Sequence, residues 1–195
     1  MNGAPIDELN AGLKAYREEL VADQLASKRV EISIVTFGPV TVVQDFTTVD
    51  AFTPPQLMAS GNTPMGAAIA KGIEILRERK DMYRKAGIAF YRPWIFLITD
   101  GAPTDAWNSA AEMIQSGEAR KEFAFFAVGV NDADFGVLSS LSKAREPLRL
   151  KGLRFADLFH WLSNSQQSVS RSSPADVGAV ALPDPTAGPR GWAAV

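Results

Sequence analysis

The chain has 195 residues, 46% of them hydrophobic, which is enough for one globular domain with a sizeable core. Its 20 basic and 22 acidic residues are interspersed and leave a formal net charge of −2, so no basic stripe favours nucleic acid or a membrane as partner. Cysteine is absent, which excludes disulfides, thiolate metal sites and cysteine nucleophiles. The sequence shows neither a signal-peptide pattern nor an apolar run near the roughly 20 residues that span a bilayer, so we expect a cytoplasmic protein.

The first half of the chain alternates helical and strand-like patterns. Apolar residues recur at helical spacing from Ile6 to Leu20 and again from Met65 to about Arg79, which predicts two amphipathic helices. Between them, apolar and polar residues alternate from Val30 to Ile34. Gly38-Pro39 then interrupts two β-rich runs, which predicts a hairpin.

The second half contains two short, continuously apolar runs, "WIFLIT" (Trp94–Thr99) and "FAFFAVGV" (Phe123–Val130), which are typical of parallel strands covered on both faces. Further helices are expected at residues 106–119, 134–142 and 155–168. Strands separated by helices predict an α/β, doubly wound sandwich with a mostly parallel sheet.

The domain is expected to span residues 1–169. Residues 170–195 are rich in Ser, Pro, Gly and Ala, so this C-terminal tail is expected to be mostly irregular and anchored by Leu182 and Trp192.

Two loops carry candidate functional residues, because ligands of open parallel sheets bind beyond the carboxyl ends of the strands. In "SGNTPMG" (60–66), Thr63 is expected to cap the following helix with Pro64 as its first residue, and its hydroxyl is also suited to a metal or an anion. In "TDGAPTD" (99–105), Asp100 is either a strand-end turn residue or a metal ligand. Thr104 or Asp105 is expected to cap the next helix.

Together, "ASGNTPMGAAI" and "PWIFLITDGAPTD" strongly resemble von Willebrand factor A (VWA) domains, in particular small stand-alone bacterial ones that include tellurium-resistance Y-type proteins. The resemblance implies a three-layer α/β/α Rossmann-like sandwich and a protein-interaction module that is not an enzyme. It also implies a metal-ion-dependent adhesion site for Mg²⁺, or alternatively Mn²⁺ or Ca²⁺. There Thr63 and Asp100 would be ligands, Gly61, Asn62 and Asp105 would shape the rim, and a protein partner would supply a carboxylate.

The sequence departs from that family at one place. The family's D-x-S-x-S motif and the central strand before it should precede the helix that starts near Ile6, and only "MNGAP" stands there. Three explanations are open: a start site assigned too far downstream, a strand donated by a partner or a second copy, or direct pairing of the flanking strands. With one carboxylate and one hydroxyl remaining, we expect divalent-cation binding to be weak or absent.

Other chemistry has less support in the sequence. His160 is expected on the polar side of its helix as a solvated or locally bonded residue, and Asp132 and Asp134 as turn and N-cap residues. Two alternatives to the interaction module stay open. One is a Mg²⁺-dependent phosphoryl-transfer or hydrolytic enzyme using Asp100 and Asp105, and the other is a metal-free scaffold.

Overall fold

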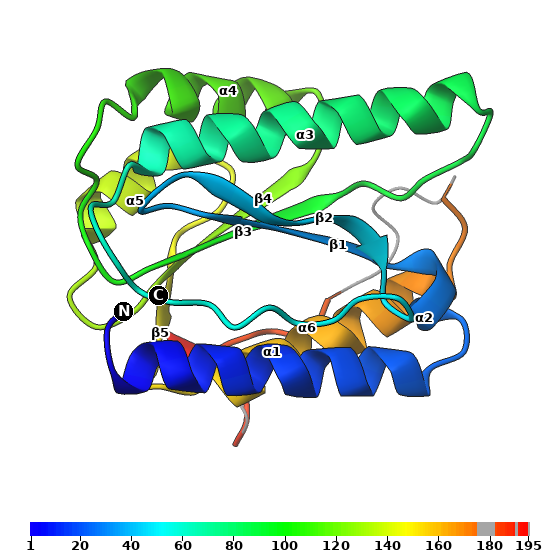
Figure 1. Cartoon of the computed structure of the whole chain (residues 1–195), viewed down its shortest axis with the longest axis horizontal. Coiled ribbons are helices and arrows are strands. Elements are labelled where there is room, and N and C mark those ends of the chain that lie inside the picture. The colour runs from blue at the N-terminus through cyan, green and yellow to red at the C-terminus, as the bar shows by residue number, and fades with distance from the viewer. Residues whose placement is uncertain (175–181, 190, 195) are drawn as a thin grey trace. The chain divides into compact units, whose positions relative to one another are not determined.

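The computed structural model describes residues 1–174, 182–189 and 191–194. The described chain separates into two compact units. The first contains residues 1–34, 42–59 and most of the chain from 150 onward, and the second contains residues 35–41 and 60–149. Each unit is built from helices and strands, which Figure 1 labels in chain order.

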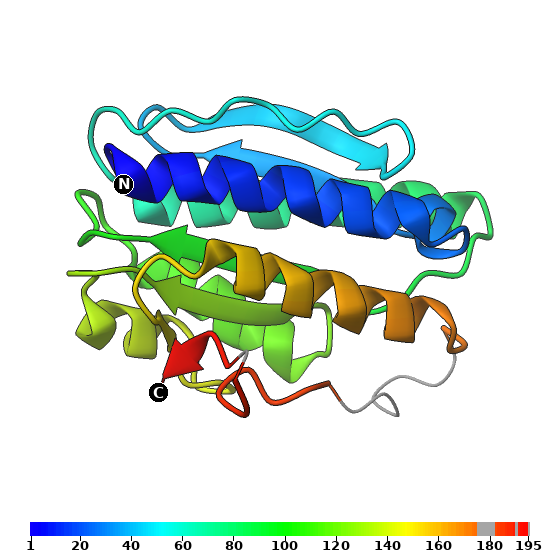
Figure 2. The same cartoon turned by 90° about the horizontal axis from the view of Figure 1, so that it is seen from below.

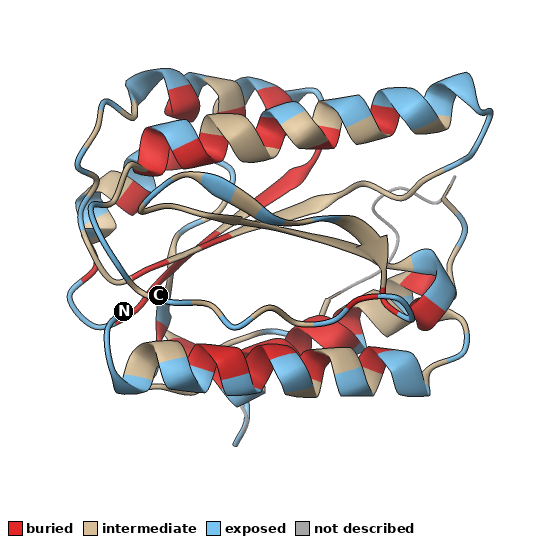
Figure 3. Ribbon diagram, viewed as in Figure 1, coloured by how far each residue is buried: buried red, intermediate tan, exposed pale blue. Residues whose placement is uncertain are grey.

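The first unit is organised around two long helices that lie side by side, α1 (Ala4–Ala22) and α6 (Phe155–Ser170). The buried residues of α1 recur at helical spacing along one stripe, as the apolar periodicity predicts (Figure 3). Tyr16 lies on this stripe, with its ring centroid 5.5 Å from that of Phe159. A Cβ placed on Gly12 would come within 2.6 Å of the Phe159 ring, so glycine allows the two helices to approach closely.

Shorter segments complete the first unit. The four-residue helix α2 (Ala26–Arg29) follows α1, and the segment after the hairpin is fixed to α1 through Asn10. The buried Asn10 amide donates to the carbonyl of Leu57 and accepts from its N–H, both at 2.9 Å. The hydrogen-bonding groups of this polar side chain are therefore satisfied by one backbone residue.

The predicted hairpin is confirmed and consists of β1 (Glu31–Thr36) and β2 (Thr41–Thr48), which form an antiparallel two-stranded sheet. Its tip, residues 37–40, belongs to the second unit. The hairpin forms a sheet of its own, separate from the four-stranded sheet.

The second unit contains the predicted parallel strands. β3 (Trp94–Thr99) pairs in parallel with β4 (Ala124–Gly129) over all six residues, and Figure 2 shows the two arrows running in the same direction. The helices of this unit are α3 (Met65–Lys85), α4 (Asn108–Ala119) and α5 (Phe135–Leu141), of which α3 and α4 are neighbours. The apolar runs thus form the strands that the sequence predicts, with boundaries within one residue.

Two short strands extend the larger sheet. β5 (Leu148–Leu150) pairs in parallel with β4, and β6 (Ala193–Ala194) lies beside β5, which makes the order β3-β4-β5-β6. Neither was predicted, because two or three residues are too few for a periodic pattern. The result is an α/β fold with a mixed, mostly parallel four-stranded sheet, a small hairpin and helices packed around the strands.

The C-terminal tail contributes to the core. Trp192 is fully buried, and its ring centroid lies 5.8 Å from that of Trp161 on α6, which agrees with its predicted anchoring role, whereas Leu182 is only half-buried. α6 continues to Ser170, two residues beyond the predicted end. The predicted irregular tail also includes residues 175–181, 190 and 195, which lie outside the described part of the chain.

Candidate functional site

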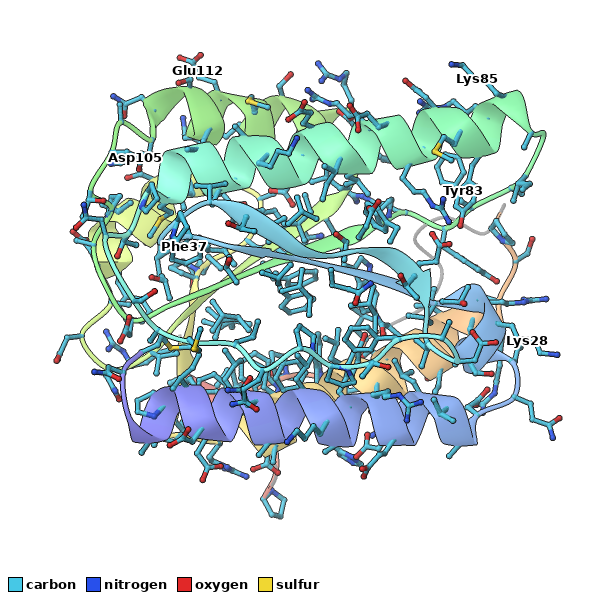
Figure 4. The ribbon with its side chains drawn as sticks, in the orientation of Figure 1. Lys28, Phe37, Tyr83, Lys85, Asp105 and Glu112 are labelled. Atoms are coloured by element: carbon cyan, nitrogen blue, oxygen red, sulfur yellow. The ribbon has the colours of Figure 1, made fainter. Side chains whose placement is uncertain are left out.

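Three loops of the second unit meet at the beginning of α3: the hairpin tip (37–40), the loop 60–64 and the loop 100–105 that follows β3. Figure 4 shows Asp105 beside the first turn of α3, and Phe37 of the hairpin tip is labelled in the same region. Because these loops come from distant parts of the sequence, their contacts define the candidate site.

Thr63 is joined to the loop after β3 by two reciprocal hydrogen bonds. Its N–H donates to Oγ1 of Thr104 at 3.1 Å, and the Thr104 N–H donates to the Thr63 carbonyl at 2.9 Å. A Cβ placed on Gly101 would lie 3.8 Å from Oγ1 of Thr63, which is ordinary van der Waals contact. The Thr63 hydroxyl therefore faces Gly101, the residue directly after Asp100. Asp100 itself is half-buried and directly follows β3.

Asp105 holds the first turn of α3. One carboxylate oxygen accepts the N–H of Gly66 at 3.0 Å and the other accepts the N–H of Ala67 at 2.8 Å. Unpaired N–H groups at a helix start carry a partial positive charge, so a carboxylate is a suitable partner for them. Asp105 is thus an N-terminal cap supplied from about forty residues away in sequence.

These contacts correct three predictions about capping. α3 begins at Met65, so Pro64 is its N-cap residue rather than its first residue, and no side chain caps it locally. The expected N-cap role of Thr63 is therefore wrong. The expected capping of the next helix by Thr104 or Asp105 is also wrong, because the N-cap residue of α4 is Trp107, without a side-chain hydrogen bond. Both residues bond instead to the chain around the start of α3.

Glycine is required where the backbones approach. A Cβ on Gly66 would lie 2.4 Å from the carbonyl oxygen of Ala106. A Cβ on Gly38 would lie 2.3 Å from the carbonyl oxygen of Ser60 and 2.7 Å from that of Asn62. Contacts this short with backbone atoms have no room to relax, so larger residues would separate the loops.

The hairpin tip was not predicted to belong to the site. The Ser60 hydroxyl donates to the carbonyl of Gly38 at 3.0 Å, and the neighbouring Gly61 has a φ of 71°. Gly61 and Asn62 are exposed beside this contact, as rim residues would be. The Gly-Pro pair in the tip signalled a turn, whereas its packing partner depends on tertiary structure.

The oxygen donors of these loops are few. The described residues contain no cluster of three or more His, Cys, Asp or Glu side chains suited to a metal ion. Both oxygens of Asp105 accept helix N–H groups. Of the two ligands that the family resemblance implies, Thr63 has a hydroxyl and Asp100 a carboxylate. These two hard oxygens suit Mg²⁺ chemically, but they would leave most of its six positions to water.

Other predicted candidates have structural partners. Nδ1 of His160 lies 2.8 Å from Oε1 of Glu19, and Nε2 lies 3.0 Å from the amide nitrogen of Asn164, which confirms the prediction of a locally bonded histidine. Asp134 caps α5 by accepting the N–H of Val137 at 3.0 Å, as predicted. Asp132 is exposed.

Comparison with known protein families gives no match, and comparison with curated proteins also gives none. Within the residues that the structure describes, no helix combines the length and the apolar character needed to cross a membrane.

Proposed function

We propose that this chain is a protein-interaction module of the VWA type, with a docking face formed by Thr63, Asp100 and the surrounding loops. The observation that carries the proposal is the reciprocal hydrogen bonding of Thr63 and Thr104, together with the 3.8 Å approach of the Gly101 position to the Thr63 hydroxyl. These contacts support the convergence of the two loops that the family resemblance requires. Gly61 and Asn62 would form the rim.

A divalent cation would bind this face weakly. Thr63 and Asp100 would supply one hydroxyl and one carboxylate, and a partner's carboxylate together with water would complete the coordination. We therefore expect Mg²⁺ affinity to depend on the partner rather than on the isolated chain.

The use of Asp105 weighs against the alternative of a phosphoryl-transfer or hydrolytic enzyme. A catalytic carboxylate pair needs both groups available, but the Asp105 oxygens accept two N–H groups of α3. In addition, residues 35–41, 60–66 and 99–105 contain no Lys or Arg to bind a phosphate. The interaction module requires neither feature.

The separation of the two sheets supports a second mode of partner binding. Among the described strands, β3 pairs only with β4 and lies at the edge of its sheet. An uncharged edge strand such as Trp94–Thr99 can accept a strand from a partner or a second copy. Strand donation is therefore part of the proposal.

Titration with Mn²⁺, a paramagnetic substitute for Mg²⁺, tests the docking face by amide NMR. We expect the amide signals of residues 61–63, 100–102 and 104 to broaden together at millimolar Mn²⁺, and this broadening to be lost in Asp100→Ala. Asp132→Ala, which removes an exposed carboxylate outside these loops, is the matched control and should leave it unchanged.

Three results would contradict parts of the proposal. Broadening that persists in Asp100→Ala would show that Asp100 does not bind the cation at the docking face. Submillimolar Mg²⁺ affinity of the isolated chain by calorimetry would contradict the expected weak site. Once a partner is identified, binding that is unaffected by Asp100→Ala and Thr63→Ala would favour a metal-free scaffold.

A further inference from the structure

Basic residues gather at the C-terminal end of α3 in the second unit. Residues 77–92 and 120–122, which we call the basic end, contain eight Lys or Arg and three Asp or Glu. The remaining residues contain twelve Lys or Arg and nineteen Asp or Glu. The whole-chain charge of −2 therefore conceals a strong local excess of positive charge.

Contacts between the two segments hold the basic end together. The Arg77 guanidinium donates to both carboxylate oxygens of Glu122, at 2.8 and 3.2 Å. The Lys80 ammonium donates to the Glu122 carbonyl at 2.7 Å. Glu122 thus joins α3 to the segment that precedes β4, although the two lie more than forty residues apart in sequence.

Aromatic rings fix further cations on the same part of the helix. The guanidinium carbon of Arg79 lies 4.9 Å from the centroid of the Tyr83 ring, and that of Arg84 lies 5.8 Å from the centroid of the Phe90 ring. The two rings contact each other with centroids 5.9 Å apart. These cation–π contacts limit how far the charged groups can move.

Two apolar side chains are exposed among these charges. Met82 is 57% exposed and Ile88 is 51% exposed, and both belong to the large exposed hydrophobic residues of the described chain. The Ile88 N–H donates to the Tyr83 carbonyl at 2.9 Å, which folds the segment after α3 back onto the helix end. Residues 84–89 are all exposed, and Figure 4 shows Lys85 at this end of α3.

We propose that the basic end binds the surface of a membrane that contains anionic phospholipid. Several of its cations already donate hydrogen bonds within the protein, so they contribute positive potential but few free donors. A diffuse anionic surface needs only the potential, whereas recognition of nucleic acid or of an acidic peptide needs donors for individual groups. A lipid interface would also bury Met82 and Ile88.

The proposal is independent of the docking face. α3 has 21 residues, so its two ends are roughly 30 Å apart at 1.5 Å per residue. A membrane bound at the C-terminal end leaves the loops at the N-terminal end accessible. The two proposals can therefore fail separately.

Cosedimentation with lipid vesicles tests the inference. We expect the full chain to bind vesicles containing about one third phosphatidylserine, to bind pure phosphatidylcholine about tenfold less or weaker, and to be released as salt rises from about 0.1 M to about 0.5 M. Lys85→Glu combined with Lys121→Glu reverses two exposed charges of the basic end and should weaken binding about tenfold or more. Ile88→Ser should weaken it by a smaller factor.

The control is Lys71→Glu, which reverses a partly exposed lysine near the N-terminal end of α3, outside the basic end, and should leave vesicle binding nearly unchanged. Thermal unfolding of each variant identifies any loss that comes from misfolding. Equal binding to neutral and anionic vesicles would overturn the proposal, as would a loss in Lys71→Glu that matches the loss in the double variant. Tighter, salt-sensitive binding to a poly-glutamate peptide or to an oligonucleotide than to vesicles would also overturn it.

Discussion

At the scale of single residues, Asp105 supplies the N-terminal cap that α3 lacks locally. We expect Asp105→Ala to lower the free energy of unfolding by about 1–2 kcal/mol, because the N–H groups of Gly66 and Ala67 lose their acceptor. Urea denaturation measures this change. Asp132→Ala neutralises an exposed acid and should stay within about 0.5 kcal/mol of the unchanged protein. Equal losses in the two variants would contradict the cap.

Glu122 makes stability depend on pH. Hydrogen bonds from the Arg77 guanidinium hold the pKa of the Glu122 carboxyl below its ordinary value of 4.5. Because the folded pKa lies below the unfolded one, this stabilisation is present above pH 4.5 and is lost as pH falls through the lowered pKa. We expect Glu122→Gln to lose less stability than the unchanged protein between about pH 6 and pH 3. If chemical denaturation gave the same dependence of stability on pH for Glu122→Gln and for the unchanged protein, Glu122 would not be a source of the pH dependence.

At the scale of elements, the contact between α1 and α6 depends on Gly12. We expect Gly12→Ala to destabilise the protein by about 1–2 kcal/mol, because the added methyl group meets the Phe159 ring at 2.6 Å. Gly72→Ala is the matched control within α3, where an added Cβ meets nothing within 4 Å. It should stabilise the protein by about 0.5–1 kcal/mol through helix propensity. Thermal or urea unfolding of both variants separates the effect of packing from that of helix propensity. An equal loss of stability in both variants would contradict the close contact between Gly12 and Phe159.

The elements that the sequence predicted well are those with a local cause. Trp94–Thr99 forms β3 at the predicted residues, because a continuous apolar run that ends at an Asp-Gly turn is already a strand pattern. Capping of α3 was predicted incorrectly because its acceptor, Asp105, comes from another loop. A membrane partner was not predicted, because the even charge balance of the whole chain indicated no basic surface. Residues 120–122 join residues 77–92 only in the folded chain, through contacts such as that of Arg77 with Glu122.

At the scale of the whole molecule, we expect the position of β3 at the edge of the described four-stranded sheet to affect how copies of the chain interact. An apolar edge strand without charge or proline can pair with a strand of another molecule, so we expect association that increases with concentration in sedimentation velocity. Ile98→Lys places a charge on this strand and should reduce the association. Val43→Lys adds the same charge to the hairpin strand β2 and should have less effect. Equal effects would indicate that net charge alone controls association.

The coarse fold class follows from the order of strands and helices, whereas the division into a hairpin and a separate four-stranded sheet does not. The likeness to the VWA family implied a missing central strand, and the two separate sheets are compatible with that implication. The convergence of Thr63 with the loop after β3 was predictable because strand ends of an α/β sheet collect functional loops. The part played by Gly38 was not predictable, since it rests on a backbone approach between loops distant in sequence.

The cap formed by Asp105 links the loop that follows β3 to the solvent accessibility of two backbone protons. Any molecule that draws this loop away from α3 would release the amides of Gly66 and Ala67 to water and accelerate their exchange with deuterium. A molecule that fixes the loop in place would slow the same exchange. These two amides therefore report on events at the loops before any partner has been identified.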